Sequence, residues 1–248
     1  MKDKIEGACY SSIGRVRKNN EDNFYFSGII MDEKNFGTEN SIEDNFIKGD
    51  NKVFAIFDGM GGEAKGERAS YLAAKELKKL REEEKIINWE EYCFLANDKI
   101  CIEMQDGKRM GSTLAAIQFL DDYISIANLG DSRIYYLKDN RLKQISKDHT
   151  ETISTDMAKK HKPRLTKHLG IRKDELIIHP SQKIVFYDDI EKIILCSDGI
   201  TDRISDEEIE RILKEENSPK KCCETLVKLA NENGGTDNIT VMVFNLYS

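Results

Sequence analysis

Residues 112–145 contain three short apolar runs, Leu114-Ala115-Ala116-Ile117, Tyr123-Ile124-Ser125-Ile126-Ala127 and Ile134-Tyr135-Tyr136-Leu137. Their length and composition predict strands. Residues 112–145 thus offer three or four strands that only short turns join, including Lys138-Asp139-Asn140, whereas parallel pairing needs a connection of about a dozen residues or more. These strands must therefore pair antiparallel.

Similar apolar runs and two pairs of amphipathic segments lie on either side of this region. Further strands are predicted at residues 24–26, 53–57, 184–186, 193–195 and 239–244. Helices are predicted at residues 63–82, 89–104, 206–215 and 219–232, with Ser205 as a cap and Ser218-Pro219 as a start signal. Strands in groups and helices in pairs predict an α+β fold. We expect a central β-sandwich of two antiparallel sheets, with a pair of antiparallel helices on each outer face.

A length of 248 residues suits one large domain, and we expect residues 1–248 to form it. Two stretches fall outside the predicted core. Residues 32–51 are polar and acidic and are interpreted as a loop insertion. Residues 147–168 are polar and basic, with the run Lys159-Lys160-His161-Lys162-Pro163-Arg164. They are either a solvated surface loop or a short flap over a phosphate site.

Composition limits the partners and the compartment. A net charge of −7 disfavours nucleic acid and anionic membranes as partners. The six cysteines form no C-x-x-C pair and are interpreted as free thiols in a reducing cytosol. The N-terminus lacks the apolar stretch of a signal peptide, and no run approaches the roughly 20 apolar residues of a membrane span. We expect a cytoplasmic monomer.

Acidic residues stand beside glycines or at the ends of predicted strands over almost the whole chain. They are Glu21-Asp22, Asp58-Gly59, Asp131, Asp198-Gly199 and Asp237. A single Asp-Gly is usually only a turn, but three such acids at strand ends, with Glu21-Asp22 as well, are poorly explained by turns alone. Hard cations such as Mg²⁺ and Mn²⁺ prefer carboxylate, carbonyl and water oxygens. The pattern predicts one metal site assembled by folding, and a hydrolase.

Eight short motifs follow one another along nearly the whole chain. They are Arg17–Asp22, Asp58–Gly62, Gly111–Leu114, Asn128–Arg133, Lys147–His149, Leu165–Gly170, Ser197–Asp202 and Gly235–Thr240. Each is weak alone, but eight in this order are highly specific. The chain resembles the type-2C metal-dependent protein phosphatases, the PPM family, in their bacterial form. The resemblance implies a single catalytic domain with a central β-sandwich flanked by helix pairs, in agreement with the pattern above.

The resemblance also implies a binuclear Mn²⁺ or Mg²⁺ centre. Asp58 would bridge both cations, and Asp198 and Asp237 would complete the first site. The backbone carbonyl of Gly59 and Glu21, directly or through water, would serve the second site. Asp22 would hold a metal-bound water.

Three further residues match positions with roles in the family. Arg17 matches the arginine that grips phosphate, for which a guanidinium fork is suited. Asp131 and Asp202 match acids that contribute to a third, weaker metal site in many bacterial members. For Asp131 the alternative is a turn residue that is ion-paired with Arg133.

The implied reaction is hydrolysis of phosphoserine and phosphothreonine on proteins. Two cations lower the pKa of a shared water, and the resulting hydroxide attacks phosphorus in line. The metals and Arg17 offset the charge that grows on the phosphoryl oxygens. The partners implied are phosphorylated proteins and a cognate Ser/Thr kinase.

One position departs from the better-known members of the family. Met60 stands where many eukaryotic relatives carry a histidine that is assigned as the general acid. Without that histidine, the leaving group would be protonated by a metal-bound water or another donor, or would leave unaided. His149 is a candidate donor, but a structural, hydrogen-bonding role is favoured for it.

The sequence is also compatible with two rival functions. The segment 59–64 also fits G-x-G-x-x-A, the dinucleotide-binding pattern. Two features argue against dinucleotide binding. Asp58 would direct a carboxylate at the pyrophosphate. A second predicted helix also follows the first, so that no βαβ unit closes. The other rival is a catalytically inactive, PPM-like regulatory or binding module. The complete set of metal-binding carboxylates argues against this alternative.

Overall fold

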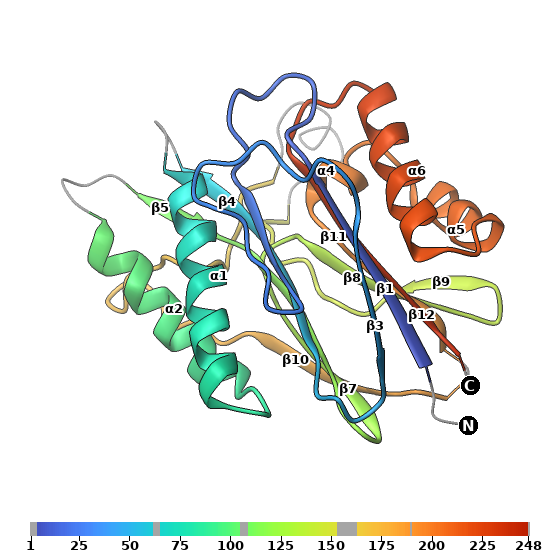
Figure 1. Cartoon of the computed structure of the whole chain (residues 1–248). Coiled ribbons are helices and arrows are strands. Elements are labelled where there is room, and N and C mark those ends of the chain that lie inside the picture. Colours follow the sequence, from blue (N-terminus) through green and yellow to red (C-terminus); the bar gives the residue numbers. More distant parts are fainter. Residues whose placement is uncertain (1–3, 62–64, 105–108, 153–162, 189, 248) are drawn as a thin grey trace.

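The computed structural model describes residues 4–61, 65–104, 109–152, 163–188 and 190–247. Two antiparallel sheets face each other, and a pair of helices covers each outer face (Figure 1). Every strand pair in the described part of the chain is antiparallel. The predicted fold class and the arrangement of its layers are therefore confirmed.

The first sheet has the order β3 (Ile42–Ile47), β1 (Lys4–Ser12), β12 (Ile239–Leu246), β11 (Ile190–Cys196), β8 (Arg133–Lys138) and β9 (Arg141–Gln144). The second has the order β10 (Ser181–Phe186), β7 (Tyr123–Leu129), β6 (Leu114–Phe119), β4 (Val53–Gly61) and β2 (Asp22–Phe26). The short strand β5 (Met110–Ser112) pairs with the end of β4. Strand β4 therefore continues to pair beyond the main sheet, through Gly59, Met60 and Gly61.

Helices α1 (Gly66–Glu83) and α2 (Trp89–Glu103) pack on the second sheet. Helices α5 (Asp206–Glu215) and α6 (Pro219–Glu232) pack on the first, and a short helix, α4 (Asp198–Thr201), follows β11. The predicted bounds of α5 and α6 are confirmed. Ser205 caps α5, because its hydroxyl accepts a hydrogen bond from the Glu208 N–H at 3.3 Å.

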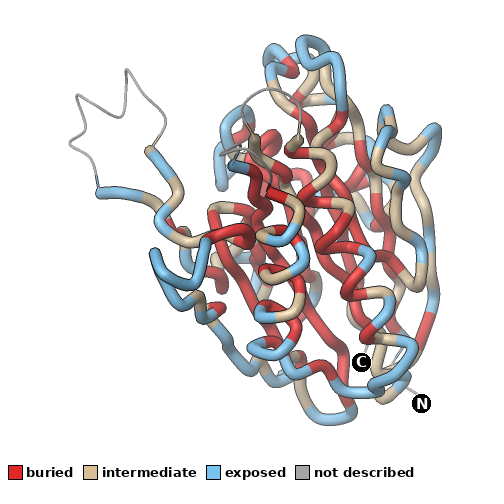
Figure 2. Tube along the Cα trace, turned by 90° about the vertical axis from the view of Figure 1, so that its left-hand side faces the viewer, coloured by how far each residue is buried: buried red, intermediate tan, exposed pale blue. Residues whose placement is uncertain are grey.

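Strand β4 shows how the layers are held together. Because successive side chains point to opposite faces of a strand, Phe54 and Ile56 enter the core between the sheets, while Ala55 and Phe57 face α1 and α2. The ring of Phe54 lies 4.6 Å from that of Phe244 on the opposite sheet, measured between ring centroids. Figure 2 shows that the inner strands are buried along most of their length, whereas exposure is concentrated in loops, outer helix faces and edge strands such as β10.

Two parts of the first sheet were not predicted. Residues 32–51, interpreted as a loop, contain β3, which pairs with β1 and buries Phe46 against the sandwich core. Strand β1 itself is central, but its small and polar residues do not form an apolar run. Gly7 is required there because a Cβ atom would lie 2.7 Å from the ring of Phe244.

The basic segment 147–168 is described only in part. Residues 153–162, with the run 159–162, lie outside the described residues, so the prediction of a flap stays a prediction there. At its ends, Thr150 and Leu165 form an isolated antiparallel bridge. No helix in the described part of the chain is long and apolar enough to cross a membrane.

Candidate metal and phosphate site

A cavity of about 360 Å³ opens where several connections between strands meet. Seven of the nine predicted site residues line it: Arg17, Glu21, Asp58, Gly59, Asp131, Asp198 and Asp237. The remaining lining residues are Met60, Gly61, Thr113, Pro163, Arg164 and Leu165. Folding thus brings residues from nearly the whole chain to one place, as the dispersed acids predicted.

Asp58 is held in place by backbone hydrogen bonds at the end of β4. Its N–H donates to Thr113 Oγ1 at 2.9 Å, and the N–H of Thr113 donates to the carbonyl of Asp58 at 2.9 Å. Thr113 Oγ1 also lies 2.7 Å from Ser132 Oγ, which ties Asp58 to the turn before β8. Thr113 belongs to the motif Gly111–Leu114, but the sequence did not reveal that it holds the backbone of Asp58 in place.

The pKa of Asp58 is raised well above its ordinary value. Desolvation is the largest cause, although the side chain is partly open to the cavity, and the charges of Asp198, Asp22, Asp131 and Asp237 add to it. Crowded carboxylates repel one another in a site of low dielectric, and a bound cation relieves this repulsion. The electrostatics of the cavity therefore favour a cation.

Glu21 and Gly59 supply a second pair of oxygens. A Cβ atom on Gly66, the first residue of α1, would lie 2.6 Å from Glu21 Oε1 and 2.9 Å from the carbonyl oxygen of Gly59. Gly66 also donates its backbone N–H to the Glu21 carboxylate. Gly59 tolerates no side chain, because a Cβ there would lie 2.1 Å from the Gly66 carbonyl oxygen. These are the two residues that the resemblance assigned to the second cation.

Asp22 lies beneath the cavity and does not line it. It is fully buried, and its Oδ2 accepts hydrogen bonds from Ser197 Oγ at 2.8 Å and Thr240 Oγ1 at 2.7 Å. Burial raises the pKa of Asp22 to about 7, against the lowering effect of these two hydroxyls. Asp22 thereby connects β2 to the segments that carry Asp198 and Asp237, which is a positioning role. Its water-mediated contact to a cation stays a prediction.

Asp198 and Asp237 enter the cavity from the same end of two neighbouring antiparallel strands. Asp198 follows β11 and begins α4, and Asp237 precedes β12. The guanidinium of Arg17 donates to Asp237 Oδ2 at 2.8 Å, and its other terminal nitrogen lies 3.7 Å from Glu21 Oε2. The predicted phosphate-binding group thus lies among the predicted metal ligands.

The two residues of the predicted third metal site are placed differently. Asp131 lines the cavity, whereas Asp202, at the C-terminal end of α4, is exposed and is not among the lining residues. The turn around Asp131 requires Gly130, whose φ is +95° and whose Cβ would lie 2.6 Å from Thr113 Cγ2. The geometry therefore supports a site role for Asp131 more directly than for Asp202.

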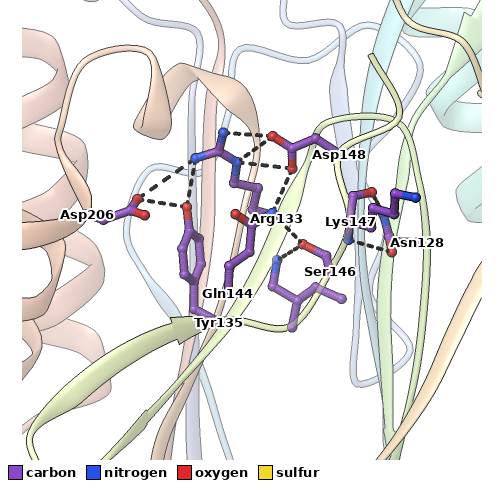
Figure 3. Close-up of polar contacts among 9 residues, drawn as sticks. Asn128, Arg133, Tyr135, Gln144, Ser146, Lys147, Asp148 and Asp206 are labelled. Carbon is purple, nitrogen blue, oxygen red and sulfur yellow. Dashed lines mark hydrogen bonds and ion pairs between the residues drawn. The ribbon is translucent and has the colours of Figure 1, made fainter. Parts of the chain in front are cut away.

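Arg133 is engaged away from the cavity (Figure 3). Its guanidinium donates to Asp148 Oδ2 at 2.7 and 3.0 Å and to the hydroxyl of Tyr135 at 3.0 Å. The Tyr135 hydroxyl in turn donates to Asp206 Oδ1 at 3.0 Å, at the start of α5. This network fixes the strand that follows Asp131 and engages the guanidinium of Arg133 with Asp148 and Tyr135.

Both ring nitrogens of His149 take part in hydrogen bonds within the fold, which supports a structural role. The N–H of Gly130 donates to His149 Nδ1 at 3.1 Å, so Nδ1 is the acceptor and Nε2 carries the hydrogen that is donated to Ser181 Oγ at 2.8 Å. Burial, followed by the charges of Lys167 and Lys147, lowers its pKa. His149 also lines a separate hollow beside Lys147 and Ser181.

Arg164 is a site residue that the sequence did not single out. It is exposed and lines the cavity, and it is the last residue of the predicted basic run. The charge of that run was the available signal, but nothing in its sequence distinguished Arg164 from the neighbouring lysines. The side chain adds a second guanidinium to the lining of the cavity.

A cysteine-based site is excluded by burial. Cys9 and Arg15 have the Cys-x5-Arg spacing of cysteine-dependent phosphatases. Cys9, however, lies inside β1 in the core between the sheets, where desolvation raises its pKa well above the ordinary thiol value. A nucleophilic cysteine needs an exposed, ionised thiolate.

The donors of the cavity fit a hard divalent cation. They are carboxylate oxygens and one backbone carbonyl, and neither histidine nor cysteine lines the cavity. Among the described residues, no group of three or more Asp, Glu, His or Cys side chains lies close enough together to hold a metal ion as the side chains stand. Arg17 stands between Glu21 and Asp237 instead. The fit therefore rests on the type of donor and on the crowding of charge.

The dinucleotide alternative is not supported by the topology. Helix α1 is followed by α2, and the next strands, β5 and β6, both pair antiparallel with β4. A dinucleotide-binding unit needs a parallel strand after the first helix.

Comparisons with known proteins agree with the geometry. The model of the family described as protein phosphatase 2C matches residues 41–232. The serine/threonine phosphatase stp of Listeria welshimeri is 31% identical over an alignment of 252 positions, gaps included. The alignment covers 93% of this chain and 91% of that protein.

Two solved structures are similar over nearly the whole chain. The Mycobacterium tuberculosis serine/threonine phosphatase PstP/Ppp has a TM-score of 0.76 at 30% identity, and the match covers 99% of this chain and 100% of that one. The catalytic domain of PstP in complex with two manganese ions gives a TM-score of 0.76 at 29% identity, with the same coverage. The chain therefore belongs to the protein phosphatase 2C family.

Proposed function

We propose that this chain is a metal-dependent protein serine/threonine phosphatase that hydrolyses phosphoserine and phosphothreonine. One observation carries the proposal: a single cavity holds the oxygen donors of Asp58, Asp198, Asp237 and Glu21 together with the guanidinium of Arg17. The carboxylates suit cations and the guanidinium suits phosphate, and a metal-dependent phosphatase needs both in contact with one substrate. The names of the relatives in two bacterial genera support the same activity.

Different residues of the cavity would bind each of two Mn²⁺ or Mg²⁺ ions. Asp58 lies between the other acids and would bridge the ions, Asp198 and Asp237 would complete the first site, and Glu21 with the Gly59 carbonyl would hold the second. The manganese ions bound by the PstP catalytic domain support this count. When bound, such ions lower the pKa of water and withdraw charge from phosphoryl oxygens. Asp131, with Asp202, would provide a third and weaker site.

Arg17 binds and orients the phosphate. Its hydrogen bond to Asp237 places the guanidinium at the edge of the acidic cluster, where the planar fork can donate to two phosphate oxygens. Its positive charge also offsets the charge that accumulates in the transition state. Asp22 acts through the hydroxyls of Ser197 and Thr240, which position the neighbouring ligand segments.

Neither Met60 nor His149 protonates the leaving serine or threonine oxygen, which takes its proton from a water molecule or another donor or leaves unaided. Met60 lines the cavity but has no proton to donate, and both ring nitrogens of His149 are engaged elsewhere. We therefore expect the rate to show no dependence on a histidine acting as general acid.

The remaining proposals concern the setting of the reaction. Residues 1–248 act as one catalytic domain, the substrates are phosphorylated proteins, and a cognate Ser/Thr kinase supplies them. The predicted cytoplasmic location and monomeric state belong to the same proposal. A catalytically inactive regulatory module is the alternative, but the cavity retains the four carboxylates proposed to bind the two cations directly, those of Glu21, Asp58, Asp198 and Asp237.

The test is hydrolysis of a chromogenic phosphate ester and of a phosphothreonine peptide with Mn²⁺, with Mg²⁺ and with excess chelator. We expect turnover of both substrates with Mn²⁺ and loss of turnover with chelator. Absence of Mn²⁺-dependent turnover on both substrates, in protein shown to be folded by circular dichroism, would contradict the proposal.

A further inference from the structure

A second cavity, of about 310 Å³, lies directly beside the acidic one. The two cavities share Met60 and Gly61, the last residues of β4. This size is at the lower end of the range of about 300–1,000 Å³ for ligand pockets, which suits a side chain better than a whole substrate. The second cavity, called here the methionine pocket, therefore adjoins the place where the phosphorylated residue would bind.

The floor of the methionine pocket is apolar. It is formed by Met60, Met104, Met110 and Ile171. Three unbranched thioether side chains adapt to apolar partners of different shape. The rim differs from the floor, because Arg109, Arg172 and Glu175 surround the opening and Arg109 donates to Glu175 at 2.7 Å. Two arginines and one glutamate leave the rim net positive, which suits an anionic phosphopeptide.

Residues 168–171 form one wall of the pocket, and hydrogen bonds to Asn97 fix its position. The carboxamide oxygen of Asn97, which is buried on α2, accepts from the N–H groups of Gly170 at 2.7 Å and Ile171 at 3.0 Å. Its nitrogen donates to the carbonyl of Ile171 at 3.0 Å. These three hydrogen bonds hold Ile171 in the position where its side chain lines the pocket.

Glycines allow this wall to lie directly against β5. A Cβ on Gly111 would lie 2.6 Å from His168 Nδ1, and a Cβ on Gly170, at φ +94°, would lie 2.3 Å from the carbonyl oxygen of Met110. Ser112 and Leu169 exchange both backbone hydrogen bonds, at 3.0 and 2.8 Å. The pocket is thus bounded by an extension of the β4–β5 ladder that also carries Asp58.

We propose that the methionine pocket binds an apolar side chain of the phosphoprotein, two or three residues from the phosphorylated residue. The inference rests on the proposed phosphatase function and adds a sequence preference to it. Met60 and Gly61 lie two and three residues beyond Asp58, which corresponds to about 7–10 Å at the strand rise of about 3.3 Å per residue. An extended peptide covers the same distance in two or three residues.

The test compares phosphothreonine peptides that carry alanine, leucine or aspartate at one position at a time, from three residues before to three residues after the phosphothreonine. Enzyme with Mn²⁺ is used throughout, and kcat/KM is measured. We expect leucine to exceed alanine by about tenfold at one position two or three residues away, because filling an apolar pocket has an effect of this order. Equal kcat/KM values for leucine and alanine at all positions would overturn the proposal.

Variants connect the preference to the pocket. Met104→Gln places a polar group on the floor, and Ile171→Ala removes part of it, so each should reduce the leucine preference while turnover of a small aryl phosphate is retained. Ile102→Gln is the matched control, because Ile102 is 69% exposed on α2 and does not line the pocket. A preference that persists unchanged in both folded pocket variants would contradict the assignment.

The two proposals fail in different ways. If the phosphatase function is wrong, neither the aryl phosphate nor any peptide is hydrolysed. If only the pocket is wrongly assigned, the aryl phosphate and all peptides are hydrolysed without a leucine preference. The peptide series on the unmodified protein decides this even if a pocket variant does not fold.

Discussion

The guanidinium of Arg17 donates a hydrogen bond of 2.8 Å to the carboxylate of Asp237, across 220 positions of sequence. Arg17 precedes β2 in the second sheet, and Asp237 precedes β12 in the first. The contact therefore spans the two sheets at the end of the sandwich where the acids gather. It places a group that prefers phosphate against groups that prefer cations.

Replacement of Arg17 tests its role in holding phosphate. Because a hydrogen bond to a charged partner contributes about 1.5–3 kcal/mol, we expect Arg17→Ala to raise the KM for phosphopeptides by about 10- to 100-fold. Arg17→Lys should fall between, because lysine keeps the charge but lacks the planar fork. Steady-state kinetics with Mn²⁺ measure both values. A fall in kcat with KM unchanged would place Arg17 in stabilisation of the transition state alone.

Replacement of Asp58 tests the metal centre. Asp58→Asn keeps the size of the side chain and its backbone hydrogen bonds to Thr113, but it removes the central negative charge. We expect a folded protein with less than about a tenth of the activity and with weaker Mn²⁺ binding by titration calorimetry. Asp174→Asn, at an exposed position outside the cavity, is the control and should behave as wild type. Retention of full Mn²⁺ affinity by Asp58→Asn would contradict its role as a bridging ligand.

The layers of the fold were predictable because most of their strands are continuous apolar runs. Strand β4 is the clearest case, since Val53–Phe57 is buried on both faces between α1 and the opposite sheet. Strand β1 escaped prediction although it is central. Its small residues are selected by close packing against Phe244 and α6, and this requirement depends on neighbours that are distant in sequence. Strand β3 is an edge strand with alternating exposure, so it resembles a polar loop.

The acids of the site were predictable from their positions at strand ends, but their supports were not. Asp22 shows the difference. The resemblance implied that Asp22 holds a metal-bound water, but nothing in the sequence indicated that its carboxylate is buried and accepts hydrogen bonds from Ser197 and Thr240. Those two hydroxyls come from segments that meet only when the first sheet has formed. Arg164 likewise lines the cavity only because the folded chain brings its segment there, and this position is not visible in the sequence.

Gly66→Ala tests the second cation position separately from the first. The added Cβ would lie within 3 Å of both Glu21 Oε1 and the Gly59 carbonyl oxygen, so these oxygens must move apart. Alanine itself is favourable in a helix, so the helix should form. We expect Mn²⁺ titration to show loss of one of two binding events, with the other retained. Lys65→Ala, at the neighbouring position, is the control for a general effect on the start of α1 and should leave both binding events intact. Two unchanged binding events in Gly66→Ala would remove Glu21 and Gly59 from the second site.

His149→Gln tests whether this histidine is structural. Removal of a general acid lowers the rate by about 100-fold or more, whereas a structural role predicts that most of kcat is retained with a small loss of stability. The pH dependence of stability gives a second measurement of the role of His149. Because burial lowers the pKa of His149 in the folded protein, the unfolded chain takes up the proton first as the pH falls through about 6.5. Stability should therefore decrease from pH 7 towards the lower folded-state pKa, and this part of the decrease should be absent in His149→Gln. Urea unfolding at several pH values measures it. A 100-fold loss of kcat in a variant of unchanged stability would restore His149 as a catalytic acid.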